Sequence, residues 1–361
     1  MWISNAYIKD FRNLCINEQN LSSGVNILHG ENAQGKTSFL EAVYFCAFGR
    51  SLRASIDKEL IAFGKNEAHM RVDINRDGYI STLDAHIESL GTKSKKGIAI
   101  NNVPIKHMKD LFGKILVVMF SPEDLRLIKA GPYERRRFMD MEICQLSNIY
   151  YSDLREYHRA LKQRNALLKI LQKDKSQVDS LDVWDIQLAN FGTRVMKARM
   201  LFVKKVNDIA KEIHSNITQG TEDLELVYDP NVTHIDNYFD NMSKVRKRDI
   251  LQGTTTVGIH KDDILFKING ISARNYGSQG QQRTAALSAK LAEIEIIKQQ
   301  TNETPILLLD DVLSELDGNR QQFLINQISD LQTLITCTGL EDVLLHIKDC
   351  KILKVNDGRI E

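Results

Sequence analysis

The sequence has no excess charge of either sign, few cysteines and no long hydrophobic run. Its 48 Lys and Arg residues balance 47 Asp and Glu residues, so a polyanionic partner would have to be met by a local basic patch. The five cysteines are scattered and form no CxxC pair, so neither a zinc site nor a disulfide framework is indicated. No apolar run approaches the roughly 20 residues of a membrane-spanning helix, and the N-terminal residues carry charge too early for a signal peptide. We therefore expect a soluble, cytoplasmic protein.

Proline is also scarce, with five in all and none between residues 140 and 215. In that stretch, apolar residues follow the 3.6-residue helical period on both sides of a polar break at residues 173–182. The periodic residues are Leu154, Tyr157, Leu161, Leu168 and Leu171, then Leu188, Phe191, Val195, Ala198 and Phe202. The pattern predicts an antiparallel helical hairpin. Two helices packed on a core and a protruding arm fit the pattern equally well.

Short runs rich in Val, Ile, Leu and Phe lie on both sides of this helical region. They predict strands at residues 25–29, 69–74, 98–100, 115–120, 224–228, 264–268, 306–309, 333–336 and 351–355. We therefore predict an α/β domain made of both chain ends, residues 1–135 and 220–361, interrupted by a helical insertion at residues 136–219.

One eight-residue stretch matches the phosphate-binding loop G-x-x-x-x-G-K-[ST] at every fixed position. It comprises Gly30, Glu31, Asn32, Ala33, Gln34, Gly35, Lys36 and Thr37, with Ser38 next in the chain. A predicted strand precedes it and a predicted amphipathic helix, residues 37–47, follows it. In such loops, backbone N–H groups and the helix N-terminus surround phosphate oxygens, so Lys36 is expected to reach the β- and γ-phosphates and Thr37 to supply a hydroxyl to Mg²⁺. The loop predicts binding of a nucleoside triphosphate.

A second candidate element ends the predicted strand at residues 306–309. Four consecutive aliphatic residues indicate a strand buried on both faces, and Asp310 and Asp311 follow at its C-terminal end, where open α/β sheets bind ligands. Asp310 is expected to hold Mg²⁺, directly or through water. Asp311 would accept a proton from the attacking water or orient it. Lys36, Asp310 and Asp311 are thus the predicted catalytic residues.

A polar loop, Ser278-Gln279-Gly280-Gln281-Gln282, precedes an Ala- and Leu-rich helix. It resembles the signature loop of ABC-type ATPases. The resemblance implies a P-loop NTPase head in which Ser278, Gly280 and Gln281 of one copy contact the γ-phosphate bound by a second copy. A bare backbone, a hydroxyl and neutral amides can approach a phosphate closely because they bring neither a Cβ clash nor a repelling carboxylate.

Two further segments resemble parts of the same class. Residues 314–317, Ser-Glu-Leu-Asp, resemble the loop that touches the opposite head, and residues 333–338 resemble the strand leading to the switch residue. The switch histidine of the class is missing there, which leaves Thr336 or Thr338 as the hydrogen-bonding group. The signature lies 248 residues after Gly30 (278 minus 30), much farther than in transporter ATPases.

This layout is similar to the SMC-like branch of the class, and several segments are similar to its RecF family. They are the residues 9–14 (KDFRNL), 120–125 (FSPEDL), 131–140, 258–263 (GIHKDD), 278–283 (SQGQQR) and 307–317 (LLLDDVLSELD). Ile259 departs from the Pro usual at that position. The resemblance, which spans essentially the whole chain, implies an ABC-type ATPase head with a helical insertion domain.

The resemblance also implies a function in DNA replication and recombinational repair. It implies ATP and Mg²⁺ as ligands, an ATP-dependent homodimer on double-stranded DNA at gapped junctions, and recombinase loading with RecR and RecO, near the nucleoid. Asp311 stands where most ABC ATPases carry Glu, which implies slow hydrolysis. Two alternatives remain. One is a nucleotide-gated DNA clamp whose function depends on ATP binding rather than on ATP hydrolysis, and the other is a transporter-type ATPase subunit, which the spacing of the signature loop opposes.

Several basic clusters are candidates for DNA phosphate contacts, which need no particular base. They are Arg50 and Arg53, the lysines Lys93, Lys95 and Lys96, the run Arg135, Arg136 and Arg137, and Lys244, Arg246, Lys247 and Arg248. Each cluster is equally compatible with a solvated surface, and the run at 135–137 with an internal ion-pair network. His260 is a lone histidine, for which a structural role is the more common one.

Overall fold

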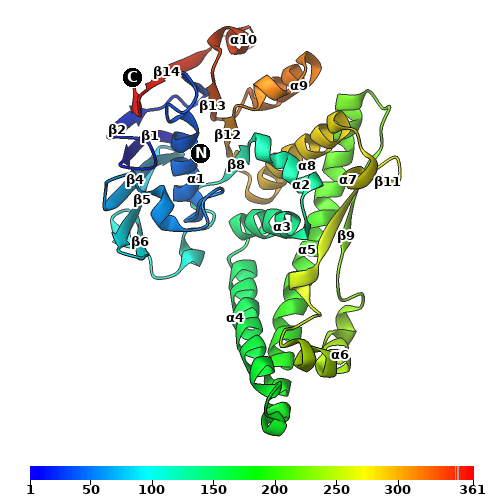
Figure 1. Cartoon of the computed structure of the whole chain (residues 1–361). Helices are drawn as coiled ribbons and strands as arrows, with labels where there is room; N and C mark the ends of the chain where they lie inside the picture. The colour runs from blue at the N-terminus through cyan, green and yellow to red at the C-terminus, as the bar shows by residue number, and fades with distance from the viewer. Residues whose placement is uncertain (346, 348) are drawn as a thin grey trace. The chain divides into compact units, whose positions relative to one another are not determined.

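The computed structural model describes residues 1–345, 347 and 349–361. The chain forms two compact units, coloured along the sequence in Figure 1. Unit 1 comprises Met1–Asp124 and Ile294–Glu361, and unit 2 comprises Leu125–Glu293. Within the described residues, no helix is both long and apolar enough to cross a membrane.

A mostly parallel sheet forms the centre of unit 1, in the order β15-β14-β3-β13-β12-β8. Its strands are β3 (Val25–His29), β8 (Val117–Phe120), β12 (Ile306–Asp310), β13 (Thr333–Cys337), β14 (Cys350–Asn356) and β15 (Arg359–Ile360). The β12 strand is parallel to both neighbours, β13 and β8, and is buried along its whole length. The prediction of a central strand ending in two aspartates is confirmed. The β3 strand lies between β13 and β14, so the two chain ends meet in one sheet.

A second, antiparallel sheet in unit 1 has the order β2-β1-β4-β5-β6-β7. Its strands are β1 (Trp2–Lys9), β2 (Asn17–Asn20), β4 (Glu67–Arg76), β5 (Tyr79–Leu90), β6 (Lys93–Ile100) and β7 (Val103–Pro104). Sequence reasoning found parts of β4 and β6 but missed β1, β2, β5 and the two-residue β7. In β5 only Leu83, Ala85 and Ile87 face the core, and polar residues alternate with them. One apolar face suffices for such a strand.

The helix after the phosphate loop, α1 (Lys36–Phe48), packs against strands of both sheets of unit 1. Its location is as predicted, but the expected amphipathic character is wrong. Residues on every side of the helix are buried, including Lys36 and Glu41. A helix enclosed on all sides carries apolar residues all round rather than on one stripe. The remaining helices of unit 1 are α9 (Gly318–Ile328) and α10 (Leu340–Leu344).

Unit 2 contains the predicted helical hairpin. The helices α4 (Asn148–Leu171) and α5 (Leu181–Thr218) pack together and are separated by a short 3₁₀ segment, Lys175–Ser180, at the predicted polar break. A three-stranded sheet, β11-β10-β9, completes the unit. Its strands are β9 (Leu224–Asp229), β10 (Asp263–Ile268) and β11 (Ile271–Ser272); the other helices are α2 (Arg126–Lys129), α3 (Pro132–Leu146), α6 (Tyr238–Gln252), α7 (Ala273–Tyr276) and α8 (Gln279–Thr301), whose last turns belong to unit 1.

The compact units do not coincide with the predicted boundaries of the insertion, residues 136–219. Residues 125–135 and 220–293 group with the helical hairpin. The reason is long-range packing, since β9 packs on α5 and pairs with β10, and Arg135 forms an ion pair with Asp263 on β10. The strands after the hairpin thus form their own sheet beside it.

Candidate nucleotide-binding site

The phosphate loop connects β3 to α1, and its conformation requires glycine at both fixed positions. A Cβ on Gly30 would lie 2.2 Å from the Val355 carbonyl oxygen, and one on Gly35 would lie 2.7 Å from Leu14 Cδ2. Gly35 also has φ +116°, in the left-handed region that side chains rarely adopt. The two glycines therefore let neighbouring atoms approach the loop closely, and Gly35 also allows its left-handed backbone conformation.

Neighbouring segments fix the loop from outside. Asn13 Nδ2 donates to the Ala33 carbonyl at 2.7 Å, and Ser38 Oγ donates to Asn13 Oδ1 at 2.7 Å. The Gly358 N–H donates to the Gln34 carbonyl at 3.0 Å. Glu31, Asn32 and Ala33 are exposed. The loop is therefore held in shape by protein contacts while its tip stays accessible.

Lys36 lies within the loop. Its Nζ donates to the carbonyl oxygens of Gly30 at 2.7 Å and Glu31 at 2.8 Å, and the residue is buried. Burial lowers the pKa of Lys36, and the nearby Asp311 carboxylate opposes that shift. The ammonium is thus already positioned where the loop would surround a phosphate.

Thr37 and Asp310, the two predicted Mg²⁺ ligands, are in direct contact. Thr37 Oγ1 donates to Asp310 Oδ1 at 2.7 Å, and Thr336 Oγ1 donates to the same oxygen at 3.0 Å. Asp310 is 2% exposed. The contact arises because β3 and β12 are parallel and flank β13, so their carboxyl ends meet at one edge of the sheet. A hydroxyl and a carboxylate oxygen form a hard-oxygen donor set, which fits Mg²⁺.

Asp311 adopts a left-handed backbone conformation, with φ +53°. Its N–H donates to Thr336 Oγ1 at 2.9 Å, which holds the residue in place. Asp311 also borders a cavity of about 80 Å³ together with Thr336, Cys337, Thr338 and Ser314. Of the two threonines predicted as substitutes for the switch residue, Thr336 contacts Asp310 and Asp311, and Thr338 lines the cavity.

Arg53 also lies at this site, although the sequence placed it among the DNA candidates. Its Nη2 donates to Asp310 Oδ2 at 2.9 Å, and its Nε lies 3.4 Å from Glu123 Oε1. Ser51 Oγ accepts from the N–H groups of Arg53 and Ala54 at 2.9 and 2.7 Å. The segment after α1 is therefore folded so that Arg53 reaches Asp310, a predicted Mg²⁺ ligand. Its position 257 residues from Asp310 left no local signal in the sequence.

The signature loop begins α8 in unit 2 with a reciprocal cap. The Gln281 N–H donates to Ser278 Oγ at 3.2 Å, and the Ser278 N–H donates to Gln281 Oε1 at 2.8 Å. Gln281 Nε2 donates to Glu222 Oε1 at 3.0 Å, and Gln282 Nε2 donates to the Ala273 carbonyl at 2.9 Å. Ser278 and Gln279 are exposed. Hydrogen bonds of Gln281 and Gln282 therefore anchor the loop, while Ser278 and Gln279 remain exposed to solvent.

The segment at 314–317 is held between β12 and α9. Ser314 Oγ donates to the Asp311 carbonyl at 2.8 Å, and Asp317 caps α9 by accepting from the Arg320 N–H at 3.0 Å. The side chain of Glu315 lies outside what the structure describes. The Ser314 contact joins the segment to Asp311, the predicted catalytic residue.

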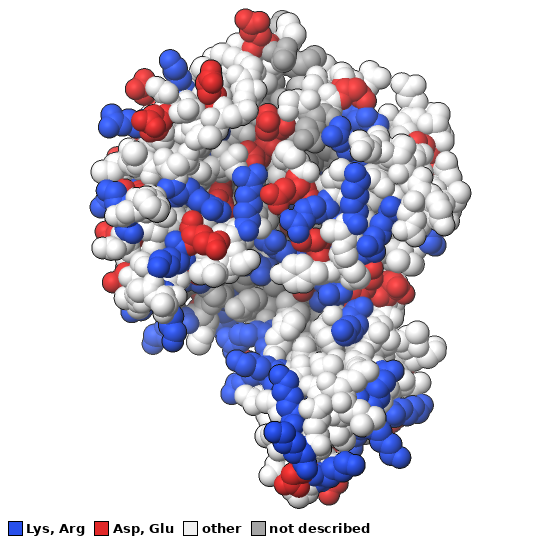
Figure 2. Space-filling model, in the orientation of Figure 1, with Lys and Arg blue, Asp and Glu red and all other residues white. Residues whose placement is uncertain are grey.

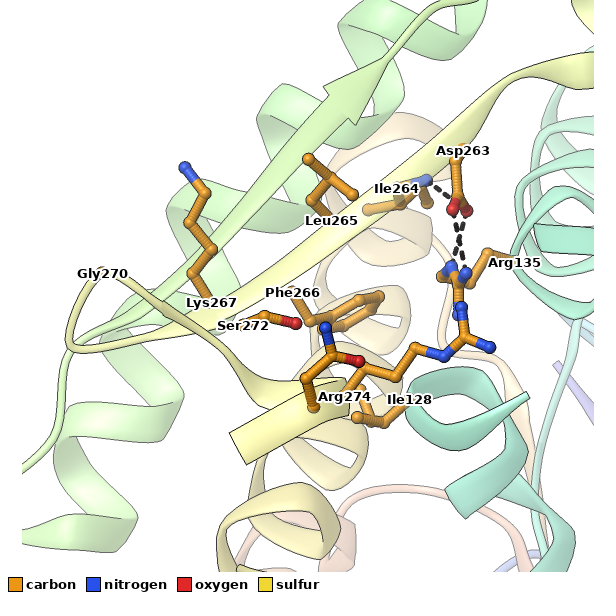
Figure 3. Close-up of a pocket in the computed structure, with 11 residues that line it drawn as sticks. Ile128, Arg135, Asp263, Ile264, Leu265, Phe266, Lys267, Gly270, Ser272 and Arg274 are labelled. Atoms are coloured by element: carbon orange, nitrogen blue, oxygen red, sulfur yellow. Dashed lines mark hydrogen bonds and ion pairs between the residues drawn. The ribbon is translucent and has the colours of Figure 1, made fainter. Parts of the chain in front are cut away.

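The run at 135–137 is partly internal. Arg135 is 3% exposed and binds Asp263 through two hydrogen bonds of 2.6 and 2.9 Å (Figure 3). Arg136 Nη1 donates to the Asp262 carbonyl at 2.7 Å. For Arg135, the predicted internal ion pair is therefore what the structure contains, and this buried side chain is not accessible to a DNA phosphate.

The other basic candidates divide into paired and unpaired side chains. Lys96 pairs with Asp57, Arg246 with Asp182 and Asp185, and Arg248 donates to Thr256. In the described part of the chain, Arg50, Lys93, Lys95, Lys244 and Lys247 form no ion pair, and Arg248 has only its hydrogen bonds to the Thr256 hydroxyl.

His260 has a structural environment. Its Nε2 lies 3.1 Å from the Thr255 carbonyl, and its Nδ1 lies 2.8 Å from Tyr157 Oη. A carbonyl only accepts, so Nε2 carries the proton and Nδ1 accepts from the tyrosine. Burial lowers the pKa of His260 to about 4. The neutral ring joins three segments of unit 2, as expected for a structural histidine.

Together, the phosphate loop after the parallel strand β3, the strand β12 that ends in Asp310 and the signature loop define an ABC-type ATPase fold. A family model described as "RecF/RecN/SMC N terminal domain" matches residues 2–357. The chain is 47% identical to the DNA replication and repair protein RecF of Lachnospira eligens and 48% identical to that of Lachnoclostridium phytofermentans, each comparison covering 100% of this chain and 99% of the relative. The chain belongs to the RecF family of DNA replication and repair proteins.

Solved structures agree. One of the recombination mediator protein RecF with ATP, in the RecFOR pathway, is 33% identical with a TM-score of 0.93, over 100% of this chain and 97% of that one. An Smc head domain derived from Pyrococcus furiosus is 15% identical with a TM-score of 0.57, over 100% of this chain and 95% of that one. The second likeness concerns the fold alone.

Proposed function

We propose that this protein binds ATP and Mg²⁺ in the phosphate loop and dimerises in response, and that the dimer acts on double-stranded DNA in replication and recombinational repair. The observation that carries the proposal is the 2.7 Å contact between Thr37 and Asp310, two residues 273 positions apart. An ordinary strand end would not place a buried carboxylate against the hydroxyl of a phosphate loop.

The predicted site residues of unit 1 have distinct proposed roles. Lys36 Nζ, which now donates to the carbonyls of Gly30 and Glu31, would exchange these acceptors for the β- and γ-phosphate oxygens. Thr37 and Asp310 would hold Mg²⁺, which when bound neutralises charge on the phosphates. Arg53 engages Asp310 Oδ2, so the metal would bind Oδ1 beside the Thr37 hydroxyl and take the place of the hydrogen bond that now joins the two atoms. Asp311 would orient the attacking water, with slow hydrolysis.

The signature loop supports dimerisation. Ser278 Oγ accepts one bond from Gln281, so its hydroxyl hydrogen remains free to donate to a phosphate. Gly280 lies at the N-terminus of α8, where the helix dipole is positive. We propose that Ser278, Gly280 and Gln281 contact the γ-phosphate bound by the other copy, so that each site is complete only in the dimer.

The proposed partners follow from family membership. We propose double-stranded DNA at gapped junctions as the nucleic acid, RecR and RecO as protein partners, and the cytoplasm near the nucleoid as the location. The solved relatives are described as a recombination mediator in the RecFOR pathway, which supports RecR and RecO as the protein partners.

A second candidate is a nucleotide-gated clamp in which ATP binding does the work and turnover is incidental. The observation that favours it is Asp311 in place of the longer Glu. Asp311→Ala separates the two: DNA loading that persists without hydrolysis supports the gate, and loading that stops supports the hydrolysing enzyme. Thr336→Val gives a second variant for comparison, which keeps both carboxylates but removes the hydrogen bonds of Thr336 to the Asp311 N–H and to Asp310 Oδ1.

Light scattering after size exclusion, with and without ATP and duplex DNA, tests the main proposal. We expect a monomer without ATP and a dimer with ATP, and no ATP-dependent dimer for Lys36→Ala. A parent protein that stays monomeric with ATP and duplex would contradict the proposal.

A further inference from the structure

The helix α4 carries a stripe of basic side chains on one face. We define the α4 basic stripe as Arg155, Arg159, Lys162 and Lys169, with Lys173 just beyond the helix end. The spacings of four, three, seven and four residues place these side chains above one another on a 3.6-residue helix. All five are exposed, and the exposed fractions of the Arg155 and Arg159 side chains are 51% and 75%.

The stripe points away from the packed face of its helix. Arg164 is fully buried against Asp185 and Asp249, and it lies nine residues from Arg155, which is about half a turn around the helix axis. Tyr157, Leu168 and Leu171 share the buried side. Solvent is therefore the environment of the whole stripe. Figure 2 shows Lys and Arg side chains gathered over this part of the molecule.

The stripe is not a consequence of composition. The chain as a whole is balanced at a net charge of +1, yet no acidic residue occurs between Glu156 and Asp174. Glu156 pairs with Arg155 at 2.9 Å and lies 3.6 Å from Arg159, while Lys162, Lys169 and Lys173 form no ion pair in the part of the chain that the structure describes.

A stripe of like charges destabilises its own helix, because side chains three and four residues apart are neighbours. Exposed helix faces usually mix both signs and so avoid this cost. The four helical members span 14 residues, about 21 Å. That length matches about six base pairs at roughly 3.4 Å each, and regularly spaced Lys and Arg neutralise phosphates without reading bases.

We propose that the α4 basic stripe is a contact surface for the phosphate backbone of double-stranded DNA. The inference rests on the proposed DNA-binding function and adds a surface that the sequence candidates did not include. Arg155 and Arg159, partly neutralised by Glu156, contribute less than the three lysines.

The test compares two charge-matched variants of the full chain in the presence of ATP. Lys162→Gln with Lys169→Gln removes two stripe charges, and Lys204→Gln with Lys205→Gln removes two exposed charges from α5. Gln is close to Lys in helix propensity, so both variants should keep the parent's circular dichroism and melting temperature. Fluorescence anisotropy with a labelled duplex is measured over a salt series.

The stripe variant should bind duplex more weakly, and its plot of log affinity against log salt should be shallower by about 1.8, that is about 0.9 for each lost phosphate contact. The α5 variant should keep the parent slope. An unchanged slope in the stripe variant, or a loss confined to single-stranded DNA, overturns the inference. A parent that fails to bind duplex at all instead counts against the proposed function.

Discussion

Ser278 and Gln281 hydrogen-bond to each other twice, each through its backbone N–H and its side-chain oxygen. The pair forms a capping box, so Ser278 has a structural task in addition to its proposed contact with a phosphate. Ser278→Ala would remove both the helix cap and the proposed phosphate contact, and the loss of the cap would lower the free energy of unfolding by about 1 kcal/mol. Its effect on dimerisation alone would therefore be ambiguous.

Ser278→Asp separates the two tasks. Aspartate is a good N-cap, so we expect the melting temperature to stay within a degree or two of the parent, roughly the effect of a few tenths of a kcal/mol. Its carboxylate would repel the opposing γ-phosphate, so ATP-dependent dimerisation, measured by light scattering, should be lost while ATP binding persists. Parent-like dimerisation of Ser278→Asp would refute the contact.

Lys36→Ala tests the phosphate loop directly. Loss of two charge-assisted hydrogen bonds to phosphate should weaken ATP binding by about 3 kcal/mol or more, which is at least about 100-fold. Isothermal titration calorimetry with ATP and Mg²⁺ provides the measurement. Lys175→Ala, an exposed lysine of unit 2, serves as control and should bind ATP like the parent. Equal affinities for the two variants would exclude Lys36 from the site.

The buried His260 should make unit 2 sensitive to acid. Its pKa is about 4 in the fold, against about 6.5 for an ordinary histidine. The unfolded state therefore binds more protons between these values, so stability is full above about pH 6.5 and falls as the pH drops towards 4. At about 1.4 kcal/mol per pH unit, the loss approaches 3 kcal/mol.

Urea unfolding of the parent and of His260→Gln at several pH values checks this. Glutamine can donate to the Thr255 carbonyl and accept from Tyr157, so the variant should fold with a flatter dependence on pH. His234→Gln, at an exposed position, should leave the dependence unchanged. A parent whose stability is constant between pH 7 and 5 would rule out the neutral, buried state.

Arg164 should be among the most sensitive positions of the helical hairpin. It is fully buried and donates to Asp185 at 2.6 Å and to Asp249 at 2.7 Å. Arg164→Ala would leave the buried Asp249 without its ion-pair partner and Asp185 with Arg246 alone, and cost about 3–5 kcal/mol. Denaturant unfolding would show this as a lower midpoint, while Gln163→Ala, on the exposed neighbouring position, should change stability by less than about 0.5 kcal/mol. Similar midpoints for both would show that the network is dispensable.

The sequence was sufficient where the signal is local. The phosphate loop, the strand of four aliphatic residues before Asp310 and the two periodic helices each carry their pattern within a few consecutive turns or residues, and the structure has these elements. The α1 helix shows the limit of such patterns. Its residues indicate a helix, but only the two sheets that enclose it explain why it is apolar on all sides.

Contacts between distant segments could not be predicted in the same way. Arg53 reaches Asp310 across 257 positions, and Arg135 reaches Asp263 across 128. Both arginines occur in basic stretches that are as compatible with a DNA-binding surface as with internal ion pairs. The sequence around an arginine does not indicate which distant carboxylate it will contact. The compact units differ from the predicted domain boundaries for a related reason, because the sequence of the strand β9 looks the same whether it joins the main sheet or a small sheet of its own.

The position of β3 between β13 and β14 has a consequence for the order of events during synthesis. Roughly 300 residues separate β3 from β13, which at about 5–20 residues per second takes on the order of 15–60 s to translate. Throughout that time the strand that carries the phosphate loop has neither of its neighbours. A nascent chain therefore cannot assemble the nucleotide site, and prematurely terminated chains would expose an aliphatic strand rather than a binding-competent head.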